Sequence, residues 1–259
     1  MKLAVFNPYG LMDQESGVVY LLANFLGKQG AEVLQLRCDG AQQACARDVL
    51  SGGVRTPFSC SQCSGEQAAL AQWCGARPKA LSSLLSPSDI SQTAQWLAAA
   101  AGDALFRVEF RGVNLWEQCR EQFVSQWKLQ PGQELTPQLD RSLRQLFTSY
   151  MHTRIASERF IAASKATAHF VTRPRDAASS AYLAEARAAS GSEIATFSFS
   201  AEDEAILIET DGSPHRYETR LVLQGITSMR SDFRTWAPEV TAMVHEMLSF
   251  LGYAPDRLA

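Results

Sequence analysis

The chain has 259 residues, of which 46% are hydrophobic and 20% charged, and its formal net charge is −3. That length allows one large domain or two small ones with a sizeable core. The near-neutral charge argues against a nucleic-acid-binding or anionic-lipid-binding surface. No apolar run is long enough to span a bilayer, and Pro8 and Gly10 interrupt the first residues too early for a signal peptide. We therefore expect a cytoplasmic globular protein.

The amino-terminal segment alternates strand and helix patterns. Residues 2–6 are typical of a buried strand, residues 16–26 carry apolar side chains at helical spacing, and residues 32–36 form a second strand pattern. A strand–helix–strand opening predicts an α/β, Rossmann-like, doubly wound fold with a mostly parallel sheet. The first strand–helix loop lacks a dinucleotide or Walker fingerprint. It is either an anion site at a helix N-terminus or a plain loop that Ser16 caps.

A cysteine-rich loop follows the second strand, over residues 37–64. Its cysteines are Cys38, Cys45, Cys60 and Cys63. Two residues between the last two thiols let both sulfurs face one ion, and a second pair nearby would complete a four-thiolate site. In a reducing compartment clustered cysteines favour metal ligation over disulfides. We expect zinc or an iron–sulfur cluster, between which four thiolates do not decide. Buried inert thiols and disulfides are the two alternatives.

The middle of the chain is mainly helical by its periodicity. Helix patterns cover residues 66–73, 91–101, 114–127 and 138–165, and residues 106–110 alternate as a short strand. Cys119 belongs to the four-residue apolar stripe of its helix, which predicts a core residue and not a further ligand.

The carboxyl-terminal part repeats the strand–helix–strand pattern. A strand over 168–172, a helix over 177–189 and a strand over 193–199 are followed by strands over 205–209 and 220–223 and a helix over 236–251. We expect a single α/β domain over 1–259, in which residues 201–259 form a carboxyl-terminal hairpin and helix. The cysteine-rich loop is then an insertion in this domain.

Two arginine-containing loops are candidates for ligand binding. Arg173 and Arg175 follow a predicted strand, at the edge of the sheet where open α/β folds bind ligands, and two guanidinium groups there suit a phosphate or carboxylate. The alternative is a solvated turn. Arg230 and Arg234 lie in the second loop, which ends at Trp236. That tryptophan suits either a binding loop or a packing contact for the last helix.

The sequence offers little for acid–base catalysis. No nucleophile-elbow motif, zinc-protease motif or paired catalytic carboxylates are present. Glu15, at the end of the first strand–helix loop, is the only acidic residue that we single out as a base. Among the histidines, His152 and His245 fall within helical patterns that favour packing or surface roles, and His169 is a strand residue just ahead of the first arginine loop.

The segment Leu36-Arg-Cys38-Asp39-Gly40, followed by Cys45 and Cys60-Ser-Gln-Cys63, resembles the amino-terminal domain of bacterial surface-polysaccharide proteins. These are glycosyltransferase-like proteins of capsule and O-antigen loci. The resemblance implies a Rossmann-like domain that handles a nucleotide-sugar or a glycan acceptor. Such enzymes carry a second nucleotide-binding domain, whereas only about sixty residues follow Phe199, fewer than an ordinary domain of that kind needs.

Two hypotheses follow. In the first, the chain is a glycosyltransferase-related protein of surface-glycan assembly, in which the cysteine site orders a loop and the arginines meet phosphate. In the second, it is a non-enzymatic metal- or cluster-binding accessory or regulatory module that recognises a protein partner. The fold pattern favours the first, and the short carboxyl-terminal part favours the second.

Overall fold

The computed structural model describes residues 1–8, 14–45, 57–129, 134–189, 191–210, 213–228 and 236–253. Within them, seven strands form the central sheet in the order β3-β2-β1-β6-β7-β8-β9. Their bounds are β1 Lys2–Phe6, β2 Glu32–Arg37, β3 Arg77–Ala80, β6 Ala168–Thr172, β7 Glu193–Ser200, β8 Ala205–Thr210 and β9 Ser213–Glu218. The pairs among the first five are parallel, whereas β8 and β9 extend the sheet as antiparallel strands. The predicted Rossmann-like fold with a mostly parallel sheet is therefore confirmed.

The chain reverses its direction of travel across the sheet between β1 and β6. From β1 it moves outward to β2 and β3, and it later returns to place β6 on the other side of β1. Such a reversal leaves a crevice at the carboxyl ends of the two strands, because their connections run to opposite sides. Residues that follow β1 and β6 are therefore placed where open α/β sheets bind ligands.

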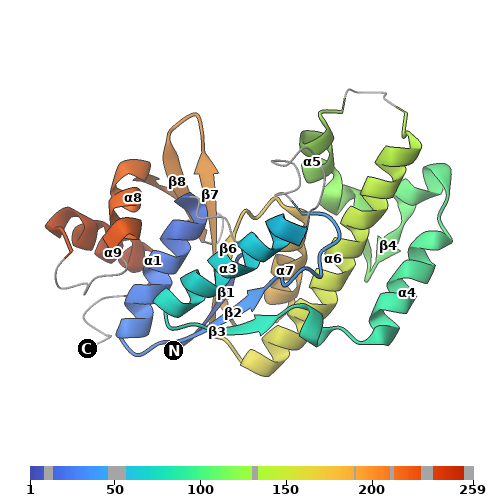
Figure 1. Cartoon of the computed structure of the whole chain (residues 1–259). Helices are drawn as coiled ribbons and strands as arrows, with labels where there is room; N and C mark the ends of the chain where they lie inside the picture. The colour runs from blue at the N-terminus through green and yellow to red at the C-terminus, as the bar shows by residue number, and fades with distance from the viewer. Residues whose placement is uncertain are drawn as a thin grey trace.

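Helices cover both faces of the sheet (Figure 1). The first face carries α1 Gln14–Lys28, α3 Pro57–Trp73, α8 Thr219–Ser228 and α9 Pro238–Phe250. The second carries α7 Ala177–Ala188 and the carboxyl half of α6 Pro137–Ser164. Alternate residues of β1 explain this division: Leu3 and Val5 pack in the first core, and Ala4 and Phe6 pack in the second.

A helical lobe packs around the amino half of α6, at the end of the molecule opposite α8 and α9 (Figure 1). It contains α4 Pro87–Ala98, the 3-10 helix η2 Gly102–Arg107, the short hairpin of β4 Glu109–Phe110 and β5 Val113–Asn114, and α5 Leu115–Trp127. Their apolar side chains surround the amino half of α6 in a third core, where Cys119 is fully buried. The predicted core role of Cys119 is thus confirmed.

Several elements differ from their predictions. The cysteine-rich loop is shorter than predicted, because α3 begins at Pro57 and makes residues 57–64 helical. Gly, Ser and Cys are weak helix formers, so packing of Leu70 against the sheet stabilises this helix where local propensity does not. Residues 220–223 belong to α8 and not to a strand. Residues 106–110 give only the two-residue strand β4.

Candidate functional site

Asn7 ties together the two loops at the reversal point of the sheet. Its side chain is fully buried just after β1; Nδ2 donates to Ser16 Oγ at 2.9 Å, and Oδ1 accepts from Thr172 Oγ1 at 3.1 Å. Ser16 belongs to α1 and Thr172 is the last residue of β6. The start of α1 and the end of β6 are therefore held in register by one amide. Ser16 is a partner of Asn7 within the helix and not the predicted cap.

A second polar contact joins three elements around Glu15, in the first turn of α1. Glu15 Oε1 accepts a hydrogen bond from the backbone N–H of Phe199 in β7 at 2.8 Å. Glu15 Oε2 lies 3.0 Å from Arg173 Nε, in an ion pair whose side chains are 12% and 26% exposed. Arg173 has a φ of 51°, a left-handed conformation that costs free energy for a residue with a side chain.

These residues open onto a cavity of about 500 Å³ beside the reversal point. Its walls come from the start of α1, the loop after β6, the end of β7 and the turn into β8. The lining residues are Glu15, Arg173, Pro174, Arg175, Asp176, Ser198, Phe199, Ser200, Glu202 and Leu207. A volume of this order accommodates a small metabolite. The lining mixes charged, hydroxyl and apolar side chains, so it suits a ligand with both polar and apolar parts.

Arg175 is the more accessible of the two cavity arginines. Its side chain is 81% exposed and lies 3.2 Å from Glu121 of α5, whose side chain is 62% exposed. Ion pairs between such exposed groups contribute little free energy, so the guanidinium is available to exchange this carboxylate for another anion. Arg173, by contrast, is held by Glu15.

The start of α7 forms part of the same wall, with an unusual cap. Asp176 occupies the N-cap position, yet its side chain makes no capping hydrogen bond to the helix. Instead, Gln122 of α5 accepts the N–H of Ala177 at 2.8 Å through Oε1. A residue of the helical lobe therefore caps a helix of the sheet layer, which ties the lobe to the cavity wall.

Arg173, Arg175 and Glu15 are separate candidates in the sequence, and the structure brings them together at one cavity. Glu15 was singled out as a base; both of its oxygens are engaged by Arg173 and the Phe199 N–H, which is a positioning contact. Arg230 and Arg234 lie outside the described residues. Trp236 is 6% exposed, and its ring centroid is 6.5 Å from that of Phe25, so it packs the last helix.

The remaining cavity residues were missed by the sequence analysis. Ser198, Ser200, Glu202 and Leu207 come from the end of β7, the following turn and β8. The only signal for them is that they follow the second strand–helix–strand unit, at the same edge as Arg173. A serine-rich strand end carries no motif, so only the fold brings these residues to the cavity.

The cysteine segment lies at the carboxyl end of β2, as predicted for Cys38. Cys38 Sγ accepts the N–H of Gly40 at 3.4 Å, and the Asp39 carboxylate accepts the N–H of Ser82 at 3.1 Å. Ser149 of α6 accepts the N–H groups of Gln43 and Ala44, both at 2.9 Å. Hydrogen bonds to neighbouring elements therefore hold residues 38–44 in place.

The other two cysteines of the motif lie on α3. Cys60 and Cys63 are both partly buried, and Gln67 Nε2 donates to Cys63 Sγ at 3.5 Å. Burial raises the pKa of the Cys38 thiol, and the neighbouring Cys63 adds to this rise. Among the described residues, which include all four predicted ligands, no group of three or more His, Cys, Asp or Glu side chains is arranged to hold a metal ion. The helix places the Cys60–Cys63 pair on α3, while hydrogen bonds hold Cys38 and its loop on other elements. The predicted four-cysteine metal site therefore has no support among the described residues.

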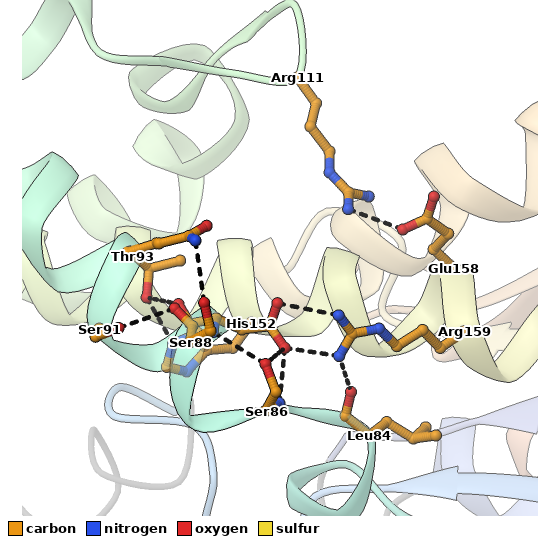
Figure 2. Close-up of polar contacts among 11 residues, drawn as sticks. Leu84, Ser86, Ser88, Ser91, Thr93, Arg111, His152, Glu158 and Arg159 are labelled. Carbon is orange, nitrogen blue, oxygen red and sulfur yellow. Dashed lines mark hydrogen bonds and ion pairs between the residues drawn. The ribbon is translucent and has the colours of Figure 1, made fainter.

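A separate polar cluster joins α4 to α6 (Figure 2). Asp89 forms a capping box with Ser86 and an ion pair with Arg159 at 2.6 Å. Hydrogen bonds from Arg159 hold the pKa of the Asp89 carboxyl below its usual range. Nearby, Thr93 Oγ1 lies 2.9 Å from His152 Nε2. All of these groups cap or join helices, so we assign the cluster a structural role. Of the packing and surface roles predicted for His152, the structure shows the packing role.

The comparisons with known proteins add a structural likeness but no family. No protein-family model and no curated protein sequence matches the chain. Among solved structures, the chain is similar to AlbC, a cyclodipeptide synthase from Streptomyces noursei, with 12% sequence identity and a TM-score of 0.42. The match covers 78% of this chain and 97% of that one. A likeness this distant transfers no activity or ligand.

The predicted function needs correction on these findings. A glycosyltransferase-related protein with a four-cysteine metal or cluster site is not supported, because no group of three or more His, Cys, Asp or Glu side chains among the described residues is arranged to hold a metal ion. The accessory-module alternative relied on the same metal site, so it has no support among the described residues either. In the part of the chain that the structure describes, no helix has the length and apolar character to cross a bilayer.

Proposed function

We propose that this protein binds a small polar ligand in the cavity at the carboxyl edge of its sheet, and that Arg175 binds an anionic group of this ligand. The observation that carries the proposal is the position of the cavity. It lies beside the reversal point between β1 and β6, where open α/β sheets bind ligands, and two arginines line it. Nucleotide-sugars and glycan acceptors belonged to the glycosyltransferase hypothesis and are not retained.

The two arginines have different roles in this proposal. Arg173 is fixed by Glu15, which in turn holds the end of β7 through the Phe199 N–H, so this pair shapes the floor of the cavity. Arg175 lies on the wall with a weakly held partner, and its planar guanidinium suits a carboxylate or phosphate. Ligand binding therefore replaces the exposed ion pair between Arg175 and Glu121 with a contact between Arg175 and the ligand that is less accessible to solvent.

The test is a binding titration that reports from the cavity. Protein labelled with ¹⁵N-phenylalanine is titrated with inorganic phosphate, acetate and citrate, and the Phe199 amide is assigned by its loss in Phe199→Leu. We expect at least one anion to shift this signal and Arg175→Ala to raise its Kd at least tenfold. Arg187→Ala, which changes an exposed arginine in the last turn of α7, should leave the Kd within twofold. An equal effect of both variants would overturn the proposal, and so would the absence of any shift with these anions and with small amino-carboxylates.

A further inference from the structure

The charges that line the cavity specify more than an anion. Three carboxylates, from Glu15, Asp176 and Glu202, face two guanidinium groups, from Arg173 and Arg175, so the lining has one more negative than positive charge. A ligand with only negative groups would be repelled by the excess carboxylates. A ligand with only positive groups would make no favourable contact with Arg175. We infer that the ligand is zwitterionic, with its anionic group on Arg175 and a cationic amino group on Glu202. This inference rests on the proposed ligand site.

Glu202 differs from the other acidic residues around it. Glu15 is paired with Arg173, and Asp203, the next residue in the turn, lies 3.2 Å from Arg216 and accepts from Ser200 Oγ at 2.9 Å. Across the described residues, Glu202 has neither an ion pair nor a side-chain hydrogen bond, although it lines the cavity. Its carboxylate is thus the acidic group that a ligand can engage without first breaking a contact within the protein.

The carboxylate of Glu202 and the guanidinium of Arg175 also lie on different segments of the chain. Arg175 comes from the loop after β6, and Glu202 from the turn between β7 and β8, so the two groups reach the cavity from different elements. Phe199 and Leu207 add apolar surface to the lining, and Ser198 and Ser200 add hydroxyl groups. This combination of opposite charges with an apolar surface matches a free amino acid or a similarly small amino-carboxylate.

The test compares probes that share a side chain and differ in which of the two charged groups they carry. L-phenylalanine carries both charges, N-acetyl-L-phenylalanine lacks the cation, and 2-phenylethylamine lacks the anion; L-serine, N-acetyl-L-serine and ethanolamine form a second set with a polar side chain. The Phe199 amide reports binding in the cavity. We expect, in at least one set, the zwitterion to bind at least tenfold more tightly than either singly charged analogue.

Two variants test whether Glu202 binds the amino group of the ligand. Glu202→Gln should weaken binding of the zwitterion about tenfold and leave the N-acetyl analogue unchanged. Glu204→Gln, in the same turn but outside the cavity lining, should change neither. If the N-acetyl analogue binds as tightly as its parent, or Glu202→Gln has no effect, the inference is wrong while the anion site stands. If no probe or anion shifts the Phe199 signal, both proposals fail.

Discussion

The carboxylate of Glu15 accepts a hydrogen bond at 2.8 Å from the backbone N–H of Phe199, a residue 184 positions further along the chain. The same carboxylate holds Arg173 at 3.0 Å. One side chain in the first turn of α1 therefore sets the position of the loop after β6 and the end of β7. These are two of the walls of the cavity.

Replacing Glu15 should loosen these walls. Glu15→Gln keeps an acceptor for the Phe199 N–H but removes the charge that balances the partly buried Arg173, and we expect a loss of about 1–3 kcal/mol in the free energy of unfolding. Urea denaturation measures this loss. Glu117→Gln is the matched control, because Glu117 and Arg120 form an ion pair on an exposed surface, 3.4 Å apart. A similar loss in both variants would show that the contacts of Glu15 contribute no more to stability than an exposed ion pair does.

Two glycines in helices should respond in opposite ways to substitution by alanine. A Cβ on Gly225 of α8 would lie 2.5 Å from Leu21 Cδ2, inside the fully buried contact between α8 and α1. We expect Gly225→Ala to destabilise the protein by about 1–3 kcal/mol through overpacking.

At Gly65 of α3, a Cβ would meet nothing within 4 Å. Gly65→Ala should therefore stabilise the protein by about 0.5–1 kcal/mol, the difference in helix propensity between the two residues. Thermal and urea unfolding of both variants test the pair. Stabilisation by Gly225→Ala would contradict the close packing of α8 on α1.

Stability should fall in acid because of His169. This side chain is fully buried in β6, with Nδ1 2.8 Å from the Tyr182 hydroxyl, and burial lowers its pKa from 6.5 to about 4. Between these values the unfolded chain binds the proton and the folded chain does not, so the free energy of unfolding decreases as pH falls through this window. The difference corresponds to about 3 kcal/mol between neutral pH and pH 4.

Urea unfolding at a series of pH values measures this dependence. His169→Gln should remove most of the slope between pH 4 and pH 6.5. Tyr182→Phe should retain the slope although it lowers stability, since burial and not the hydroxyl causes the shift. An unchanged slope in His169→Gln would assign the acid sensitivity to other groups.

The six cysteines should differ in their reaction with thiol reagents. Cys74 and Cys119 are buried, and burial raises the pKa of Cys74 to about 11 and that of Cys119 further. Reaction requires the thiolate and access to it, so we expect neither to be alkylated in the native protein at pH 8. Cys45, Cys60 and Cys63 are partly exposed and should react before Cys74 and Cys119. Peptide mass spectrometry after brief iodoacetamide treatment gives the order, and early labelling of Cys119 would contradict its place in the core.

Strongly patterned elements could be predicted from the sequence with accurate bounds. The strand over 2–6 and the strand over 168–172 coincide with β1 and β6, because both are apolar runs bounded by turn residues. β3 was missed, since its residues Arg77-Pro-Lys-Ala80 are mostly exposed and carry no strand pattern. Its place at the edge of the sheet is fixed by pairing with β2, a long-range contact.

The site was less predictable than the fold. Arg173 and Arg175 could be predicted because residues that follow a parallel strand lie at the edge of an open α/β sheet where ligands bind. Glu202 and Leu207 could not be found, because they reach the cavity only through the antiparallel turn of β7 into β8. The cysteine spacing was misleading for a physical reason: residues 60 and 63 lie on a helix, whose start is not signalled by amphipathic periodicity.

The long helix α6 belongs to two cores at once. Its 28 residues extend over about 42 Å at 1.5 Å per residue, with Leu143 and Phe147 packed in the helical lobe and Phe160 and Ile161 packed on the sheet. One continuous helix therefore connects the packing of the helical lobe to the packing of the sheet. The lobe also supplies Gln122 to the start of α7 and Glu121 to Arg175. A displacement of the lobe would therefore be transmitted to Arg175 and to the start of α7, although none of the lobe's described residues lines the cavity.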